Sequence, residues 1–497
     1  MPESLRLSRI APEAVGVESS ALVSAIDEVA HTYDLHSIMV YRDGGVIAEK
    51  WWWPADPARA HMLHSATKSF VGTAVGFAIA EGVLALDDHV ADVLSADMPA
   101  RPAPSLERLR IVDLLTMRGG NAGGISGALT RTQGAGLVRA FLAEPMTHEP
   151  GTVFTYSSAS SHLLSAAVQA RTGERVADYL QPRLFDPLGV PGPTWDTDPD
   201  GISTGGNGMR LRTEELLAYG VLHLDDGVWH GTQILPAGWT EEATRRHVPG
   251  ARAGAWDGRR LVSRPAAPGR GGYGYHFWVE PGGVYSARGV FGQLCVVHPE
   301  ARSVVAVTAG VDSRQPGLYA ALERFVLPLL EQAAGDARVA ASSSDRLLDW
   351  SLSSSRPPEP GADDMSAFVG SYEVESNEHD VRRIEIDQDA VRTVVVFDVG
   401  NATHRFDLPR RTWTLMRTSL YGADLHHSYP FTDEPVQALI RQEGADRAVL
   451  DLRFPEATFR DLIMFRLDDG ALVVSRTTNA NSGPLEHSPL IAHAVER

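Results

Sequence analysis

The sequence predicts a two-domain α+β protein, in which an antiparallel sheet flanked by helices is followed by an antiparallel β-barrel or sandwich. The chain has 497 residues, more than the roughly 250–300 that one hydrophobic core usually serves. Strand patterns stand at both ends of residues 1–340, with helical patterns grouped between them. A segment rich in serine and proline, residues 341–364, reads as a linker. Residues 365–497 then have β texture throughout, which predicts the second domain.

The first domain is expected to begin with a β-hairpin at residues 38–50, because Asp43-Gly44-Gly45 is a typical hairpin turn. Trp51-Trp52-Trp53 follows, and we interpret these rings as packing residues, with a substrate platform as the alternative. Residues 66–83 are apolar on all sides and rich in small residues, which predicts a buried helix. Further helices are predicted at residues 107–117, 161–171, 176–185 and 213–224, the last with Thr213 as its N-cap.

The end of the first domain returns to strand patterns. Four β segments follow one another at hairpin spacing, and an apolar helix over residues 318–332 closes the domain. The four segments are residues 272–279, 283–289, 293–298 and 303–309. Because the strands precede and follow the helices rather than alternating with them, the sheet is expected to be antiparallel.

The second domain is predicted from short β runs separated by turns. Several of these runs alternate apolar and polar residues, as strands with one buried face do. The runs are residues 368–374, 383–387, 393–397, 448–454 and 472–477. An antiparallel barrel or sandwich of about 130 residues is the expected outcome.

Charge and composition exclude several classes of function. The chain has 63 acidic and 45 basic residues, a net charge of −18, which disfavours nucleic acid or an anionic membrane as the partner. No apolar stretch approaches the roughly 20 residues of a membrane helix, and the N-terminus does not resemble a secretory signal, so we expect a cytoplasmic protein. The one cysteine, Cys295, excludes an internal disulfide and a cysteine-based zinc site, and we expect it to be an inert buried thiol.

Two lysines, Lys50 and Lys68, stand among the 45 basic residues. Ser65-Ala66-Thr67-Lys68 places a hydroxyl and an amine three residues apart at the start of the predicted buried helix, where they share a face. A serine at a helix N-terminus is well placed to attack a carbonyl, because backbone N–H groups there stabilise the negative charge that develops. A lysine kept partly dry can have a pKa low enough to take the hydroxyl proton.

Several ordered motifs around this pair resemble a known family. They are His36-Ser-Ile-Met-Val-Tyr-Arg-Asp-Gly, Ser65-Ala-Thr-Lys-Ser-Phe, Glu81-Gly-Val-Leu-Ala-Leu-Asp-Asp, Val112-Asp-Leu-Leu-Thr-Met, Pro150-Gly-Thr-Val-Phe-Thr-Tyr-Ser-Ser, Leu184-Phe-Asp-Pro-Leu-Gly-Val, Gly205-Gly-Asn-Gly-Met-Arg-Leu and Ala287-Arg-Gly-Val-Phe-Gly-Gln. Together they make residues 35–309 similar to the serine hydrolases of the class C β-lactamase and penicillin-binding-protein type, whose members include esterases, D-aminopeptidases, aminohexanoate-oligomer hydrolases and acyltransferases. The resemblance implies a helical subdomain inserted beside the sheet and a lipocalin-like C-terminal barrel.

The resemblance also implies roles for individual residues. Ser65 matches the nucleophile, Lys68 its partner, and Tyr156 the tyrosine of the Y-x-N motif, which serves as general base and then as acid. A phenol works as a base near neutral pH only beside a cation, and Lys68 would supply that cation. The backbone N–H groups of Ser65 and Val290 would form the oxyanion hole. Ala287-Arg288-Gly289 falls where the family has K-T-G or H-x-G, so Arg288 and Gly289 are expected to line the substrate site.

Two positions depart from the family pattern. Ser158 replaces the asparagine of Y-x-N, so a substrate contact at Ser158 differs from the family's amide contact. Ala287 replaces the K-T-G lysine that holds the antibiotic's carboxylate in β-lactamases, and Arg288 need not face the same side of the strand. We therefore favour ester or amide hydrolysis, or acyl transfer, over β-lactamase activity.

Other motifs are interpreted as incidental. Gly201-Ile-Ser-Thr-Gly matches G-x-S-x-G, but its neighbours are loop residues rather than a strand and a helix. The histidine pairs His61/His64 and His426/His427 lack a supporting carboxylate cluster, so we expect no metal and no cofactor.

The sequence thus predicts a serine hydrolase that acts on a small-molecule or short-peptide acyl substrate. Two alternatives stay open. One is an acyltransferase or peptide cyclase that passes the same acyl group from Ser65 to an amine or alcohol. The other is a non-catalytic binding protein on the same scaffold.

Overall fold

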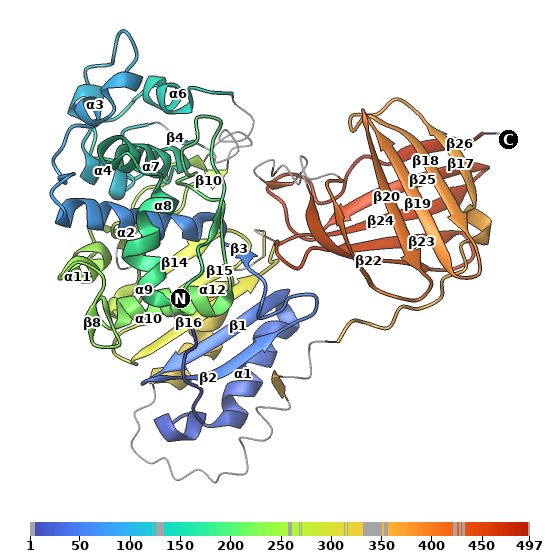
Figure 1. Ribbon diagram of the computed structural model, residues 1–497, viewed down its shortest axis with the longest axis horizontal. Helices are drawn as coiled ribbons and strands as arrows, with labels where there is room; N and C mark the ends of the chain where they lie inside the picture. The colour runs from blue at the N-terminus through green and yellow to red at the C-terminus, as the bar shows by residue number, and fades with distance from the viewer. Residues whose placement is uncertain are drawn as a thin grey trace. The chain divides into compact units, whose positions relative to one another are not determined.

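A computed structural model describes residues 5–121, 123–125, 134–256, 261–267, 269, 271–312, 314–315, 317–331, 350–351, 356–420, 425–426, 429 and 433–495. The chain divides into two compact units (Figure 1). The first holds Met1–Lys50, Pro57–Ala309 and Gly317–Leu352, and the second holds Trp51–Asp56, Gly310–Pro316 and Ser353–Arg497.

An eight-stranded sheet forms the base of the first unit, in the order β2-β1-β16-β15-β14-β13-β12-β9. Its strands are β1 (Leu35–Arg42), β2 (Gly45–Trp51), β9 (Val248–Pro249), β12 (Gly272–Tyr273), β13 (Trp278–Val279), β14 (Tyr285–Gly289), β15 (Gln293–His298) and β16 (Ser303–Ala309). All of its pairings that join β1, β16, β15, β14 and β13 are antiparallel. The strand β1 from the start of the unit pairs with β16 from its end, with Ile38 opposite Val307. The two ends of the domain sequence therefore meet within one sheet.

Helices cover the sheet and form an inserted subdomain. The helix α10 packs on β15 and β16, whereas α3, α4 and α6 gather around α7, away from β1 and β2 (Figure 1). The helices of the unit are α1 (Ser19–Thr32), α2 (Thr67–Ala80), α3 (Val90–Val93), α4 (Ile111–Leu115), α6 (Leu137–Ala143), α7 (Ser158–Thr172), α8 (Val176–Leu180), α9 (Asp186–Leu188), α10 (Thr213–Leu224), α11 (Trp239–Thr244), α12 (Leu318–Phe325) and α13 (Leu327–Glu331). The predicted α+β architecture with an inserted helical subdomain is confirmed.

Several helix predictions were wrong in detail, among them helix 107–117, which is a 3-10 turn at Leu106–Arg108 followed by α4. The predicted helix 176–185 changes to a π-helical turn at Gln181–Phe185, where Pro182 lacks the N–H that an α-helix needs. The predicted helix 318–332 divides after Phe325, just before Pro328. Thr213 is the first residue inside α10 rather than its N-cap, and its hydroxyl bonds to the Ser37 hydroxyl at 2.7 Å instead of capping the backbone.

The second unit is an antiparallel barrel, nearly closed, of ten strands in the order β20-β19-β18-β17-β26-β25-β24-β23-β22-β21 (Figure 1). The strands are β17 (Gly370–Val374), β18 (Val381–Gln388), β19 (Arg392–Val399), β20 (Ala402–Pro409), β21 (Thr414–Thr418), β22 (Glu434–Gln442), β23 (Arg447–Arg453), β24 (Arg460–Asp468), β25 (Ala471–Thr478) and β26 (Leu490–Ala494). Alternate residues are buried, as in β24, where Ile463 and Phe465 have no exposed surface. The sequence predicted a barrel or a sandwich, and the structure is a barrel.

One tryptophan of the Trp51-Trp52-Trp53 run belongs to an aromatic cluster of the second unit. The Trp53 ring lies 4.4 Å from the Trp413 ring, and the Arg453 guanidinium sits 5.2 Å from each. This agrees with a packing role for Trp53.

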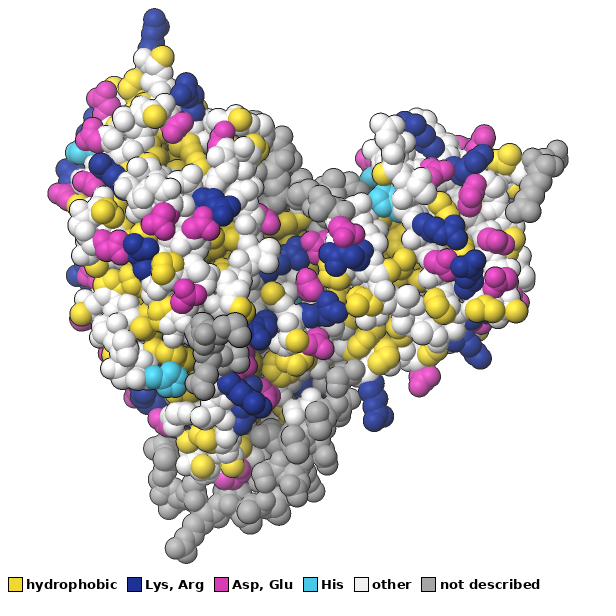
Figure 2. Space-filling view, viewed as in Figure 1, with side chains coloured by type: hydrophobic (Ala, Val, Ile, Leu, Met, Phe, Trp, Pro, Cys, Tyr) yellow, Lys and Arg dark blue, Asp and Glu magenta, His cyan; other side chains and the backbone are white. Residues whose placement is uncertain are grey.

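Figure 2 shows acidic and basic side chains interspersed on the visible faces of both units. Among the described residues, no helix combines the length and apolar character that a membrane crossing requires.

Candidate active site

Ser65 lies where a short 3-10 helix, η2 (His64–Ala66), runs directly into α2. The residue before it, His64, has a φ of +48°, in the left-handed region that residues with a side chain seldom adopt. Backbone strain of this kind persists only where the surroundings hold it, and it is common at active sites. Ser65 therefore stands at the start of a buried helix, as the sequence analysis predicted for this segment.

Lys68 lies one turn further along and is 1% exposed. Its Nζ donates hydrogen bonds to Ser65 Oγ at 2.9 Å, to the Gly206 carbonyl at 2.7 Å and to Ser158 Oγ at 3.3 Å. Burial lowers the pKa of Lys68 to about 7, because the charged amine loses its hydration. A substantial fraction of this amine is therefore neutral near pH 7, and it touches the hydroxyl that it would deprotonate.

Tyr156 lies beside this pair. Its ring centroid is 5.0 Å from Lys68 Nζ, and the Ser65 side chain is close enough to its hydroxyl to act on its pKa. The ring stacks on Trp278 at 5.6 Å and meets Tyr273 edge-on at 6.2 Å. Burial raises the pKa of Tyr156 to about 12, although the Ser65 side chain acts in the opposite direction. The phenol therefore stays protonated near pH 7, contrary to the argument that a lysine cation beside it would lower its pKa.

Two glycine positions bring a distant loop onto Lys68. A Cβ added at Gly206 would lie 2.6 Å from Ser158 Cβ, and one added at Gly205 would lie 2.1 Å from the Ser161 carbonyl oxygen. The loop is thus laid directly on the start of α7, which carries Ser158. This close packing brings the Gly206 carbonyl to the Lys68 amine, from which it accepts a hydrogen bond.

The strand β14 passes close to the turn that carries Ser65. A Cβ at Gly289 would lie 2.2 Å from the Leu63 carbonyl oxygen, so only glycine allows this approach. Val290 follows at the end of the strand, and its carbonyl accepts a hydrogen bond from Gln293 Nε2 at 3.3 Å. Gln293 is fully buried and also bonds to both backbone groups of Ala309, so it fixes the Val290 carbonyl.

Arg288 already has an anionic partner. Its guanidinium contacts Glu280 Oε1 at 2.6 Å and Ser286 Oγ at 2.7 Å. The same group stacks 3.8 Å from the Tyr319 ring and lies 5.9 Å from the Trp278 ring, which packs on Tyr156. Arg288 thus stands near the aromatic wall of the site with its charge balanced by Glu280.

His276, which no sequence pattern identified, holds the backbone of the helix that carries Lys68. Its Nδ1 donates to the Lys68 carbonyl at 3.0 Å, and its Nε2 lies 3.4 Å from Ser161 Oγ. Burial lowers the pKa of His276 to about 3, so the ring is neutral, and its φ of +60° is left-handed. The available signal was a single polar residue inside the aromatic segment 272–279, which periodicity alone does not distinguish from a core position.

The remaining candidates from the sequence do not form a second centre. His61 Nδ1 lies 2.9 Å from its neighbour's carbonyl, and its Nε2 lies 2.9 Å from His36 Nδ1, so His61 packs within the fold. His427 lies outside the described residues. The part of the chain that the structure describes contains no group of three or more His, Cys, Asp or Glu side chains suited to a metal ion. Cys295 is buried in β15, and burial raises its pKa to about 12.

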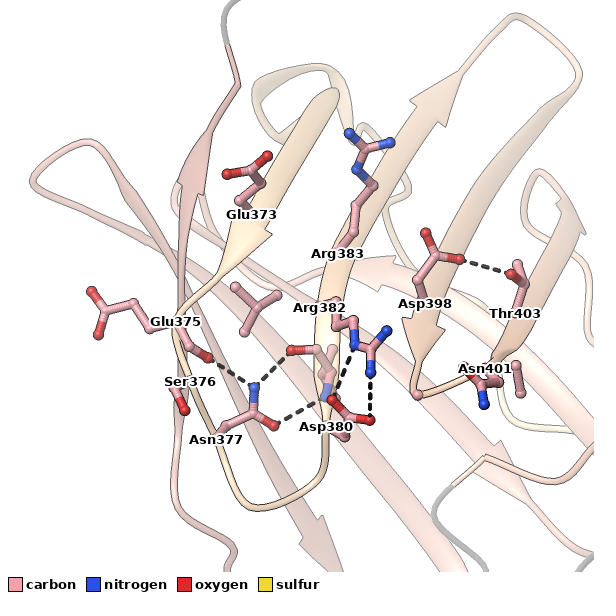
Figure 3. Close-up of a pocket in the computed structure, with 14 residues that line it drawn as sticks. Glu373, Glu375, Ser376, Asn377, Asp380, Arg382, Arg383, Asp398, Asn401 and Thr403 are labelled. Carbon is pink, nitrogen blue, oxygen red and sulfur yellow. Dashed lines mark hydrogen bonds and ion pairs between the residues drawn. The ribbon is translucent and has the colours of Figure 1, made fainter.

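A hollow of about 660 Å³ lies on the barrel, at the ends of β17 to β20 (Figure 3). Its polar side chains bind one another: Arg382 contacts both carboxylate oxygens of Asp380 at 3.1 Å, and Thr403 donates to Asp398 at 2.8 Å. Asn377 Oδ1 accepts two backbone N–H groups of its own loop. These polar side chains are thus paired within a solvated surface, and their contacts do not indicate a ligand. Ser65 and its neighbours therefore remain the candidate site.

Comparison with known proteins gives a family match over residues 29–325, to the model described as Beta-lactamase. An uncharacterized protein of Alkalihalophilus pseudofirmus is 25% identical over 231 residues, which are 40% of this chain and 62% of that protein. Penicillin-binding protein 4 of Amycolatopsis lactamdurans is 29% identical over 208 residues, which are 35% of this chain and 53% of that protein. The chain thus spans less than two thirds of the length of these curated relatives.

A solved structure shares the fold. The crystal structure of a putative beta-lactamase from Bacteroides dorei matches with a TM-score of 0.52 and 16% sequence identity, covering 64% of this chain and 100% of that one. The matched family model spans more than half of the chain and includes Ser65, Lys68 and Tyr156. Members of this family are serine hydrolases, among them esterases, amidases and carboxypeptidases. The predicted resemblance is therefore confirmed, and the chain belongs to the beta-lactamase family.

Proposed function

We propose that the protein cleaves an ester or amide bond of a small molecule or short peptide, through an acyl-enzyme on Ser65. The observation that carries this proposal is the 2.9 Å contact between Ser65 Oγ and Lys68 Nζ. The amine is buried, and its pKa of about 7 makes it a base at neutral pH.

In the first step, neutral Lys68 takes the hydroxyl proton as Ser65 Oγ bonds to the carbonyl carbon of the substrate. The electron pair of the C=O double bond moves onto the carbonyl oxygen, which becomes an oxyanion. The N–H groups of Ser65 and Val290 are the proposed donors to that oxygen. The close approach of Gly289 to Leu63, two residues before Ser65, supports bringing these two peptides to one place.

In the second step, the oxyanion re-forms the double bond and the bond to the leaving group breaks. The leaving oxygen or nitrogen needs a proton, and we assign its delivery to the Tyr156 hydroxyl. That hydroxyl lies near Ser65 and keeps its proton at neutral pH, since burial raises its pKa. The Lys68 ammonium then reprotonates the phenol. Water repeats the sequence on the acyl-enzyme and releases the acid.

The charge of Arg288 suggests which substrates fit. In this proposal the substrate lies along β14, beside Ala287 and Arg288. Ala287 offers no charge, and the Arg288 guanidinium is already bound to Glu280 at 2.6 Å. We therefore propose acyl substrates that carry no carboxylate next to the scissile bond, and a lower rate with β-lactams, whose carboxylate would have to displace Glu280.

The test compares hydrolysis of neutral p-nitrophenyl esters and p-nitroanilides with that of nitrocefin. We expect esterase or amidase turnover by the wild type, loss of turnover in Ser65→Ala and Lys68→Ala, and slow turnover of nitrocefin. Hydrolysis that survives both substitutions would overturn the proposal, and so would the absence of turnover and of acylation across the panel, which the binding-protein alternative predicts. Added amines separate hydrolysis from acyl transfer, because an acyltransferase forms amide product at the expense of free acid.

A further inference from the structure

The buried helix α7 carries a stripe of polar residues along one face. Ser158, Ser161, His162 and Ser165 follow the spacing i, i+3, i+4 and i+7, which places them on the same side of the helix. Three of them are 0% exposed, and a buried polar group costs free energy unless it is bonded. This face contacts the loop 198–207. Within that loop, the Gly206 carbonyl accepts the hydrogen bond from Lys68 Nζ.

His162 joins the helix to this loop through both ring nitrogens. Nε2 lies 3.0 Å from Asp198 Oδ2, and neither side chain is exposed. The Gly205 N–H donates to Nδ1 at 3.4 Å. A backbone N–H can only donate, so Nδ1 carries no hydrogen, and the single hydrogen of the neutral ring is on Nε2 and points at the Asp198 carboxylate.

Asp198 is itself held by the loop. Its Oδ1 accepts the N–H groups of Asp200 at 3.0 Å and of Ile202 at 2.8 Å, so this carboxylate folds its own loop before it reaches His162. At the far end of the loop, Gly205 is fixed by His162, and the next residue, Gly206, presents its carbonyl to Lys68 Nζ at 2.7 Å. A continuous chain of bonds therefore runs from Asp198 to the amine.

We propose that His162 is a positioning residue: its Nδ1 holds the Gly205 N–H, so that the Gly206 carbonyl stays against Lys68 and aims the amine at Ser65. The inference rests on the proposed function of Lys68 as the base. When Lys68 takes the serine proton, the ammonium needs acceptors, and the Gly206 carbonyl is the nearest one, at 2.7 Å. A carbonyl held in place before the reaction stabilises that charge without reorganisation.

Two substitutions of His162 separate the two bonds of the ring. In His162→Asn, the side-chain oxygen lies near the position of Nδ1, so it can still accept the Gly205 N–H, but the bond to Asp198 is lost. In His162→Gln, the terminal NH₂ lies near the position of Nε2, so it can still donate to Asp198, but the acceptor for Gly205 is lost. Both variants place an amide in the same buried position, so a merely structural role predicts similar effects of both.

The readout is kcat/KM for a neutral p-nitrophenyl ester from pH 5 to 10, corrected for the folded fraction. We expect His162→Asn to stay within about 5-fold of the wild type and His162→Gln to lose at least about 20-fold. We also expect the acid limb of the Gln profile to move to lower pH, because losing the Gly206 acceptor disfavours the ammonium form of Lys68. Asp200→Asn is the control, since the one side-chain bond that this exposed residue of the same loop makes to a described residue is to Gly136 N–H at 2.6 Å.

Equal losses in the two His162 variants, with unchanged pH profiles, overturn the positioning role. If Ser65→Ala abolishes turnover while the two variants behave alike, this inference alone fails; if Ser65→Ala retains turnover, the proposed function fails as well. Should His162→Gln not fold, ¹⁵N NMR of histidine-labelled wild type decides. The proposal requires the Nε2–H tautomer at His162, and an Nδ1–H tautomer contradicts it.

Discussion

At the scale of single residues, the proposed chemistry depends on keeping the Lys68 amine out of water. Lys68 is buried and bonds to Ser65, Ser158 and the Gly206 carbonyl. Its pKa of about 7 and the pKa of about 12 of Tyr156 differ in the sense that fits the proposed roles, with the amine as the base and the phenol as the acid.

The first prediction concerns pH. Because only neutral Lys68 can take a proton, kcat/KM should rise with pH through about 7 and then level off. Lys68→Arg should lower kcat/KM at pH 7.5 by about 10³-fold, because guanidinium stays protonated. The control is Lys50→Arg at the only other lysine, which lies 4.2 Å over the Trp350 ring, where arginine can replace it. A flat profile between pH 5 and 9 contradicts the assignment of Lys68.

The second prediction separates the roles of Tyr156 and Lys68. Tyr156→Phe removes the proton donor while keeping the ring that stacks on Trp278. The kcat/KM of p-nitroanilides should fall by about 10³-fold and that of p-nitrophenyl esters by only about 10-fold, since p-nitrophenolate leaves without a proton. Steady-state kinetics on the two substrate series checks this. Equal losses for both would assign Tyr156 to the attack step instead.

At the scale of secondary-structure elements, the site depends on how closely β14 approaches η2. The prediction here is that Gly289→Ala destabilises the protein by about 2–4 kcal/mol and lowers acylation at least about 100-fold. The new methyl group would lie 2.2 Å from the Leu63 carbonyl oxygen and push the strand away from Ser65. Gly317→Ala is the matched control, because a Cβ there meets nothing within 4 Å. Urea unfolding and single-turnover acylation measure both effects.

Hydrophobic periodicity predicted the bounds of an element best where every residue of the element is buried. The strands β15 and β16 are buried throughout and read as continuous apolar runs, so their predicted bounds agree with the structure. The predicted helix 161–171 began three residues late, because Ser158 and Ser160 are polar residues that lie inside α7 and are not part of an apolar face. Helix ends set by Pro182 and Pro328 were also misplaced.

The contacts of the site also differ in whether the sequence alone could predict them. The contact of Ser65 with Lys68 follows from a separation of three residues on one helix, which a sequence shows directly. Gly206 and His276 reach Lys68 from 138 and 208 residues away. Gly206 acts through its backbone carbonyl, and His276 acts on a backbone carbonyl. Such contacts have no side-chain pattern in the sequence, so only a family resemblance or a structure identifies them.

At the scale of the whole molecule, the barrel has a buried electrostatic centre of its own. Asp451 has no exposed surface and accepts bonds from Arg460 at 2.6 Å, Arg453 at 3.2 Å and Arg441 at 3.3 Å. Burial alone would raise the pKa of Asp451, but the arginines outweigh it and lower the pKa below the ordinary value. The carboxylate thus stabilises the barrel above the unfolded pKa of about 4, and this contribution is lost as the pH falls through the lower folded value.

We predict that Asp451→Ala destabilises the barrel by about 3–5 kcal/mol, because it leaves three guanidinium groups without their shared partner. Asp407→Ala, which removes an exposed partner of Arg392 at 2.8 Å, should cost less than about 1 kcal/mol. Calorimetry on the full chain measures both. Equal effects of the two substitutions would show that burial gives the Asp451 cluster no special weight.

The central claim is that Ser65 is a nucleophile activated by Lys68, and covalent labelling tests it most directly. A fluorophosphonate probe at pH 8, followed by intact-mass and peptide analysis, should add one label per chain, on Ser65. The rate should fall by about 10³-fold in Lys68→Arg, and labelling should vanish in Ser65→Ala. A label on another residue, or equal labelling of the wild type and Ser65→Ala, would contradict this account of the protein.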